Sequence, residues 1–393
     1  MNDLPDLRKH IAFVANTSWS LYNFRIGVMR ALTQDGYKVF ALAPRDDYSD
    51  KLTAAGITFI PINIKPHATS IIDDVKSFVQ LLRLYRKYRF DYIFHFTIKA
   101  NIYGSLAAGI TRVPSVAVIT GIGRTFQFKP LIQKAVNILY RLALKSVDAV
   151  WFLNEPDLST FKRRRLLTNQ LTTVLPSEGI NTTKFRGDDI SLKGHRVMRF
   201  LFAGRLLADK GIYQFVKAAE QLSRKPLKMK FEVLGFVNPK DPLSVSLNQL
   251  EEWQNNGWIN YLGSHEDIRP FINRADCIVF PSYYAEGISR ILLEAASMSR
   301  PIITTEQVGC RDVVEKGKTG WIIPTKSIDE LVNAILECYH LDALERLQMG
   351  LRGRERVKKL FDEKLVIEIY RDHLSKRLRN AASKKMEKQE IGH

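Results

Sequence analysis

Short apolar runs alternate with amphipathic stretches throughout the first half of the chain. Each run has the length and the β-branched or aromatic content of a buried strand: His10–Ala15, Val39–Ala43, Thr58–Ile60, Tyr92–Phe96, Ser115–Val118, Ala149–Leu153 and Thr172–Val174. Helical spacing of apolar residues falls between them, at Phe24–Gln34, Ile72–Tyr88 and Ile102–Ile110. This alternation predicts an α/β fold with a parallel, doubly wound sheet.

The same pattern restarts in the second half, with strands expected near residues 200, 231, 278 and 302. The stretch between the halves, Gly179 to Gly194, is polar and irregular and is interpreted as a linker. We therefore expect one domain over 1–194 and a second over 195–360. The remainder, 361–393, begins with a helical pattern over Asp362–Arg379 and ends in a basic tail.

Two glutamates spaced eight apart are the most informative feature of the second half. Glu286 is expected on the loop after the strand Cys277–Phe280, and Glu294 about two turns into the following helix. Gly287 allows a ligand close to the backbone, and the first amides of a helix favour an anion. The plainer interpretation is a helix-entry charge followed by a surface residue.

A second strand-to-helix loop lies earlier, in Gly204-Arg205-Leu206-Leu207-Ala208-Asp209-Lys210-Gly211. Its two cations are suited to a diphosphate: Arg205 as a fork and Lys210 as a mobile point charge. Solvated cations on a loop are the alternative, but both elements in this order within one α/β half favour a nucleotide site.

These motifs resemble those of the retaining glycosyltransferases of family 4, which have the GT-B fold. The resemblance extends through Arg300-Pro301 and Gly309-Cys310-Arg311-Asp312 and covers most of residues 199 to 340. It implies two Rossmann-like domains facing a central cleft, with the C-terminal helix crossing back to the N-terminal domain. It further implies that Arg205 and Lys210 hold the donor diphosphate and that Glu294 binds the ribose. Glu286 and the amides of Gly287, Ile288 and Ser289 would contact the donor sugar and its phosphate.

The N-terminal half is similar to a narrower group that builds bacterial O-antigen, capsule and lipid-linked oligosaccharides. Three segments carry that resemblance: Leu21–Arg25, Thr97–Gly104 and Thr120–Gly123. Because ligands bind at the carboxyl ends of parallel strands, we expect the acceptor among the loops there. The candidate acceptor-binding residues are Ser18, Trp19, His95, Thr97, Lys99, Asn101, Tyr103, Gly121, Gly123 and Arg124.

The net charge of +18 indicates anionic partners. Cations cluster in Arg83–Arg89, in the amphipathic stretch Lys129–Lys145 and in Lys162–Arg165. No nucleic-acid-binding module is recognisable, so we expect peripheral contact with an anionic membrane. Packing of Lys129–Lys145 on the sheet is the alternative. We identify neither a signal peptide nor a membrane span, and the three cysteines fit a reducing compartment.

The expected function is retaining transfer of a hexose or N-acetylhexosamine from a UDP-sugar to a polyprenyl-diphosphate-linked sugar. We place it at the cytoplasmic face of the inner membrane. No Asp-x-Asp element stands at a strand end, so we expect no metal cofactor. A GT-B sugar-nucleotide epimerase and a non-catalytic sugar-nucleotide-binding subunit are the alternatives; the epimerase would need acid and base carboxylates that the sequence does not offer. The donor sugar, the linkage and the oligomeric state stay open.

Overall fold

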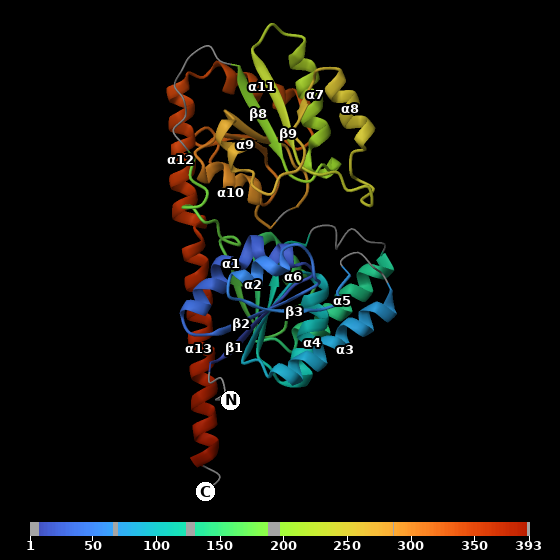
Figure 1. Ribbon diagram of the computed structural model, residues 1–393, viewed down its shortest axis with the longest axis vertical. Coiled ribbons are helices and arrows are strands. Elements are labelled where there is room, and N and C mark those ends of the chain that lie inside the picture. Colours follow the sequence, from blue (N-terminus) through green and yellow to red (C-terminus); the bar gives the residue numbers. More distant parts are fainter. Residues whose placement is uncertain (1–7, 66–69, 123–129, 188–196, 286, 391–393) are drawn as a thin grey trace. The chain divides into compact units, whose positions relative to one another are not determined.

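The computed structural model describes residues 8–65, 70–122, 130–187, 197–285 and 287–390 of the chain. Contacts divide the chain into two units (Figure 1). The first runs to Gly179 and includes the residues from Glu363 onward, and the second is Ile180–Asp362. Each unit has its own parallel sheet, as the alternating pattern predicts.

The first unit contains a seven-stranded sheet in the order β3-β2-β1-β4-β5-β6-β7, and every pairing is parallel. Its strands are β1 His10–Val14, β2 Lys38–Ala43, β3 Thr58–Pro61, β4 Tyr92–Phe96, β5 Ser115–Ile119, β6 Ala149–Phe152 and β7 Leu171–Val174. Its helices are α1 Ser18–Gln34, α2 Ser49–Ala54, α3 Ile71–Tyr88, α4 Ser105–Thr111 with the preceding π-turn η1 Ala100–Gly104, α5 Pro130–Leu144, α6 Glu155–Arg163 and α13 Glu363–Glu390.

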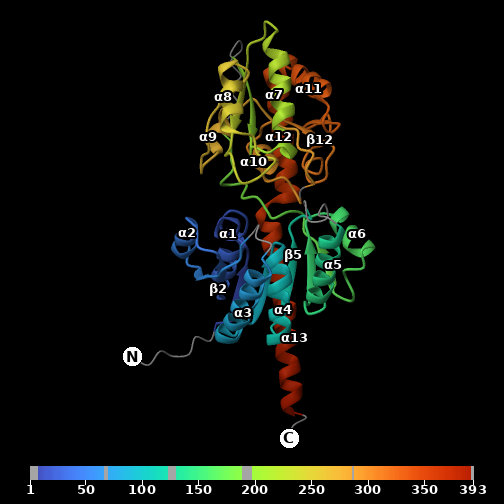
Figure 2. The same ribbon diagram turned by 90° about the vertical axis from the view of Figure 1, so that its right-hand side faces the viewer.

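Two helical layers cover this sheet, because alternate side chains of each strand point to opposite faces. Phe13, Phe94 and Trp151 face α1 and α13, whereas Ile93 and Phe152 face the layer of α3, α4 and α5. Figure 2 shows α3 and α4 on the near side of this sheet and α13 behind it. α13 contributes Val366, Tyr370 and Leu374 to the first of these cores. The C-terminal helix therefore belongs to the N-terminal unit, which confirms the crossing expected from the resemblance.

The second unit contains a six-stranded parallel sheet in the order β10-β9-β8-β11-β12-β13. Its strands are β8 Met198–Ala203, β9 Met229–Leu234, β10 Asn260–Tyr261, β11 Cys277–Phe280, β12 Ile302–Thr305 and β13 Gly320–Ile323. Its helices are the 3₁₀ turn η3 Ala208–Lys210, α7 Ile212–Ser223, α8 Leu247–Asn255, α9 Arg269–Arg274, α10 Arg290–Ser297, α11 Ile328–His340 and α12 Ala343–Phe361.

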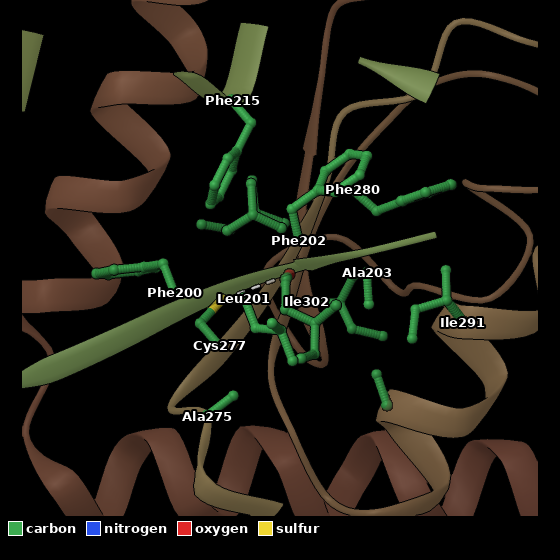
Figure 3. Close-up of a cluster of buried hydrophobic side chains, with 14 of the residues drawn as sticks. Phe200, Leu201, Phe202, Ala203, Phe215, Ala275, Cys277, Phe280, Ile291 and Ile302 are labelled. Atoms are coloured by element: carbon green, nitrogen blue, oxygen red, sulfur yellow. Dashed lines mark hydrogen bonds between the residues drawn. The ribbon is translucent and has the colours of Figure 1, made fainter. Parts of the chain in front are cut away.

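One hydrophobic core holds the second unit together (Figure 3). The centroid of the Phe202 ring on β8 lies 5.7 Å from that of the Phe215 ring on α7. It lies at the same distance from the centroid of the Phe280 ring on β11. These contacts fix the carboxyl ends of β8 and β11, where the loop of Arg205 and the loop of Gly287 begin.

The segment that follows Gly179 is attached to the second unit, whereas the sequence placed the boundary at 194. The carbonyl oxygen of Phe185 accepts the Ser297 hydroxyl at 2.6 Å, and the Thr182 carbonyl accepts the Arg354 guanidinium at 3.0 Å. These hydrogen bonds join residues more than a hundred positions apart. A polar composition could not distinguish such a segment from a linker.

Candidate functional site

The strand order of the second sheet reverses between β8 and β11, which makes their carboxyl ends a topological switch point. In open α/β sheets the ligand crevice forms at that point, because the adjacent loops turn to opposite faces of the sheet. The loop after β8 carries Arg205 and Lys210, and the loop after β11 leads to Ser289 and α10. The two sequence motifs therefore meet in one place.

Hydrogen bonds join the two donor loops directly. The Asp209 carbonyl accepts the Tyr283 amide at 3.0 Å and the Ser282 hydroxyl at 3.2 Å. The Thr305 hydroxyl, from the end of β12, in turn donates to the Ser282 carbonyl. Three neighbouring strand ends are thus fixed relative to one another before any ligand binds.

The two cations of the first loop differ in their surroundings. Arg205 is exposed and forms no ion pair with another described residue. Lys210 is buried, with its ammonium 4.1 Å from the centroid of the Tyr284 ring. An aromatic ring attracts a cation by about 0.5–2 kcal/mol and restricts its position. Lys210 is therefore a held charge rather than the mobile one expected, and sequence reasoning missed Tyr284.

The start of α10 corrects one expectation. The Ser289 amide, expected to be free for a ligand, donates to the Gly309 carbonyl at 2.8 Å. The reason is that residues 306–312 turn back over the helix start. The Ser289 hydroxyl is buried and has no hydrogen-bond partner in the described part of the chain. Gly287 and Ile288 lie on the same loop, and Glu286 lies outside the described residues.

Glu294 lies one turn into α10, because the helix begins only at Arg290. It is buried, and its Oε1 lies 2.9 Å from Nε of Arg290. Burial raises the pKa of the Glu294 carboxyl, and the neighbouring Arg290 opposes that rise. We did not single out Arg290 from the sequence, although its i, i+4 spacing to a glutamate was a usable signal.

The first unit has its own switch point, between β1 and β4. Trp19 lies beside it, 45% exposed, with its ring edge against Phe24 at 5.1 Å. Thr97, directly after β4, has a φ of +71°, which is rare for a β-branched residue, and its hydroxyl is buried without a partner in the described part of the structure. Strain of this kind is concentrated at ligand sites.

Helix α1 starts at Ser18, earlier than the Phe24 expected, because the Thr17 hydroxyl accepts the Ser20 amide and caps it. Ser18, expected near the acceptor, is fully buried. Its hydroxyl donates to the Pro44 carbonyl at 2.7 Å and lies 3.1 Å from the Ser49 hydroxyl.

His95 is fully buried, not beside a cleft as expected. Its ring lies 3.0 Å from the Tyr85 hydroxyl and 3.4 Å from that of Ser105. Burial lowers the pKa of His95 to about 3, so its ring is neutral. A Cβ on Gly104 would lie 2.4 Å from this ring, so the glycine makes room for it.

The other candidate residues of the Thr97–Gly104 segment also form hydrogen bonds within the protein. Asp74 on α3 accepts the Lys99 ammonium at 2.6 Å and the Tyr103 hydroxyl. The Asn101 amide group donates to the Val118 carbonyl at 3.0 Å. Lys99, Asn101 and Tyr103 were expected to contact the acceptor, and these internal bonds favour a supporting role instead. They support the loops at the carboxyl ends of β4 and β5.

The loop after β5 is described up to Ile122, with Gly121 at a φ of +131°, and Gly123 and Arg124 lie outside the described residues. Asp157, at the start of α6, accepts the Ile122 amide and the Asn154 side chain. Burial raises the pKa of Asp157 to about 6. Sequence reasoning did not identify this carboxylate, since nothing in the sequence relates it to residue 122.

Exposed apolar side chains on the outer layer of the first unit are accompanied by cations. We name this surface the α3–α5 face; it comprises Ile71, Ile72, Val75, Ile138 and Leu142 with the exposed cations Lys76, Arg83, Lys134 and Arg141. The guanidinium of Arg141 donates to the Arg165 carbonyl at 3.0 Å, which brings the basic cluster 163–165 beside α5.

No described helix is both long and apolar enough to cross a bilayer. Within the described ranges, no group of three or more His, Cys, Asp or Glu side chains could hold a metal ion.

Two family models match the two units in turn. One described as glycosyl transferase 4-like matches residues 10–154, and one described as glycosyl transferases group 1 matches residues 198–340. Among solved structures, a sucrose-phosphate synthase from Thermosynechococcus elongatus superposes with a TM-score of 0.79 at 19% identity, covering 95% of this chain and 100% of that one. Anabaena HepE in complex with UDP superposes with a TM-score of 0.77 at 16% identity, covering 93% and 100%.

Curated relatives match over most of their length. A Campylobacter jejuni protein is 27% identical, over 92% of this chain and 96% of its own. It is named N,N'-diacetylbacillosaminyl-diphospho-undecaprenol alpha-1,3-N-acetylgalactosaminyltransferase. An Escherichia coli UDP-Gal:alpha-D-GlcNAc-diphosphoundecaprenol alpha-1,3-galactosyltransferase is also 27% identical, over 79% and 81%. With matching models on both units, two doubly wound domains and the C-terminal helix on the first, the chain belongs to the glycosyltransferases of the GT-B fold.

Proposed function

We propose that this protein is a retaining glycosyltransferase of family 4. It moves a hexose or N-acetylhexosamine from a UDP-sugar to the sugar of a polyprenyl-diphosphate lipid, during assembly of a bacterial surface polysaccharide or glycan. The observation that carries the proposal is the joined pair of loops at the β8/β11 switch point. One loop carries Arg205 and Lys210, and the other leads to the helix of Glu294. The acceptor class rests on the names of the two relatives.

At the donor site, Arg205 and Lys210 bind the diphosphate, Glu294 accepts from the ribose hydroxyls, and Glu286 contacts the transferred sugar. Gly287 and Ile288 supply amides to the sugar and its phosphate, and Ser289 supplies its hydroxyl in place of the amide first expected. Negative charge grows on the diphosphate as the glycosidic bond breaks. Lys210, held beside the Tyr284 ring, stabilises that charge without reorganising, and Arg205 adds a second positive charge. Such stabilisation lowers the barrier most in a site that excludes water. The same cations perform the task of a divalent metal, so we propose that none is required.

Retention of configuration is supported by the linkage in the relatives' names. Both are called alpha-1,3 transferases. Common UDP-hexoses carry their nucleotide in the α configuration, so an α product keeps the configuration of the donor. In a front-face displacement, the leaving phosphate takes the proton of the acceptor hydroxyl while that hydroxyl attacks the anomeric carbon from the same side.

For the acceptor we propose the β1/β4 switch point of the first unit. Trp19 offers an exposed ring that can stack on a sugar, and Thr97 offers a hydroxyl that has no partner among the described residues. The Gly121 loop borders the same edge of the sheet. Ser18, His95, Lys99, Asn101 and Tyr103 act behind this surface by holding its loops.

The α3–α5 face is our proposed contact with the cytoplasmic side of the inner membrane. Exposed apolar side chains with cations on the same helices suit a lipid interface, where each cation near an anionic surface contributes about 1 kcal/mol. On α3 the acidic residues of the first turn, Asp73 and Asp74, are neutralised by ion pairs with Lys65 and Lys99.

A screen of UDP- and GDP-sugars with purified protein tests the proposal. Nucleotide release is read with and without a lipid-linked acceptor. We expect release from a UDP-sugar that depends on the acceptor. UDP binding without any turnover would instead identify a non-catalytic sugar-nucleotide-binding subunit.

A further inference from the structure

The ion pair between Arg290 and Glu294 is built as part of a rigid arrangement. The Arg290 guanidinium lies 2.9 Å from the Glu294 carboxylate and 5.6 Å from the centroid of the Phe185 ring. Phe185 is itself buried, and its carbonyl accepts the Ser297 hydroxyl at 2.6 Å. Arg290 therefore has little freedom to move away from the carboxylate that it holds.

Glu294 needs such a partner to stay charged. Burial favours the neutral acid and raises its pKa. Among the described residues, three charged groups act on it: Arg290 from its own helix, Lys184 from the segment after Gly179, and Asp267 from the turn before α9. Arg290 and Lys184 lower the pKa and Asp267 raises it, and of the three only Arg290 forms a hydrogen bond with the carboxylate.

The charge matters because of what the carboxylate would bind. Both oxygens of an ionised carboxylate accept hydrogen bonds, whereas one oxygen of a protonated carboxyl group carries a proton and donates. Two neighbouring ribose hydroxyls donate best to the ionised form. A hydrogen bond to a charged acceptor is also roughly twice as strong as one between neutral groups.

We infer that Arg290 is a positioning residue of the donor site, which keeps Glu294 ionised and oriented to accept from the ribose hydroxyls of the nucleotide. This inference rests on the proposed function, in which Glu294 contacts the ribose. It adds a residue that touches no substrate and acts on nucleotide affinity only through Glu294.

Calorimetric binding of UDP and of 2′,3′-dideoxy-UDP to wild type and Arg290→Met tests the role. We expect R290M to bind UDP about tenfold more weakly, a loss typical of one charge-assisted hydrogen bond. Dideoxy-UDP, which lacks both hydroxyls, should bind the two proteins almost equally. Arg290→Lys restores the charge without the planar fork and should recover part of the affinity for UDP.

A pH series separates positioning from simple packing. Without Arg290 the pKa of Glu294 rises further, so as pH is lowered UDP affinity should begin to fall at a higher pH in R290M than in wild type. The matched control is Arg274→Met, which removes an arginine 3.4 Å from another buried glutamate, Glu232. R274M should bind UDP and dideoxy-UDP with wild-type affinity, and the dependence of that affinity on pH should be unchanged.

Three results would overturn the inference. Equal losses for UDP and dideoxy-UDP in R290M would show that Arg290 merely supports the fold, and unchanged UDP affinity would show no role at all. A wild-type protein that binds UDP but does not distinguish it from dideoxy-UDP removes the ribose contact, and with it the role of Arg290. A wild-type protein that binds no UDP refutes the proposed function itself.

Discussion

Replacing Gly211 by alanine would force apart the two loops that form the donor switch point. Gly211 follows Lys210 and has a φ of +84°, and a Cβ placed on it would lie 2.2 Å from the Pro281 carbonyl oxygen. The left-handed backbone costs an L-residue about 1–2 kcal/mol, and overpacking against backbone adds about 1–3 kcal/mol. We expect G211A to lower the free energy of unfolding by roughly 3 kcal/mol. UDP affinity should fall more than tenfold, because Lys210 and the residues after Pro281 separate.

Gly257→Ala is the matched control for this prediction. Gly257 has a φ of +72°, but no atom lies within 4 Å of a Cβ placed there. G257A therefore carries only the backbone cost, about 1–2 kcal/mol, and should bind UDP normally. Chemical denaturation and calorimetry measure the two quantities. The reasoning is refuted if the two variants lose equal stability, or if G211A binds UDP like wild type.

Four further predictions follow from the same geometry. Arg205→Ala and Lys210→Ala should each reduce turnover about a hundredfold in steady-state assays, with melting temperatures near wild type for the exposed Arg205, and unchanged turnover would remove either residue from the site. Glu294→Gln should weaken calorimetric binding of free UDP, whereas Glu286→Gln should impair transfer but spare UDP binding; equal effects on UDP would contradict this division. His95 has a pKa of about 3 in the folded protein and about 6.5 in the unfolded chain. Its contribution to the free energy of unfolding is therefore complete above pH 6.5 and is lost as pH falls toward 3, by about 1.4 kcal/mol per pH unit. Chemical denaturation of His95→Gln should show a smaller loss of stability over the same pH range. Sedimentation with anionic liposomes should be strong at low salt, weakened by Gln at Arg163, Arg164 and Arg165 and by Ser at Ile72 and Val75, and salt-insensitive binding or none would rule out electrostatic docking.

The sequence predicted all seven strands of the first sheet and four of the six in the second, because apolar periodicity reports which face of each element is buried; it missed β10 and β13. It also located the loop of Arg205 and Lys210 and the loop that leads to the helix of Glu294, since a parallel sheet brings such loops to one edge. Periodicity did not reveal which polar side chains would find partners within the protein. His95 meets Tyr85, and Lys99 meets Asp74, only because α3 packs on the layer beside β4.

Loop conformation was the second feature that could not be predicted from the sequence. The Ser289 amide donates to the Gly309 carbonyl through a reverse turn that no local sequence pattern predicts. The role of Arg290 could be inferred only because the structure shows that Glu294 is buried. The segment 180–187 was interpreted as a linker from its polarity. Its attachment depends on backbone carbonyls that accept from Ser297 and Arg354, and backbone groups leave no trace in composition.

Acceptor-dependent, retaining transfer from a UDP-sugar can be observed at the anomeric carbon itself. NMR can follow a UDP-sugar labelled with ¹³C at the anomeric carbon, incubated with the protein and a polyprenyl-diphosphate-linked sugar. We expect the anomeric signal to move from the α-linked nucleotide to an α-glycoside only when the lipid-linked sugar is present. A β-glycoside, an epimerised UDP-sugar, or the same signal change without acceptor would contradict it.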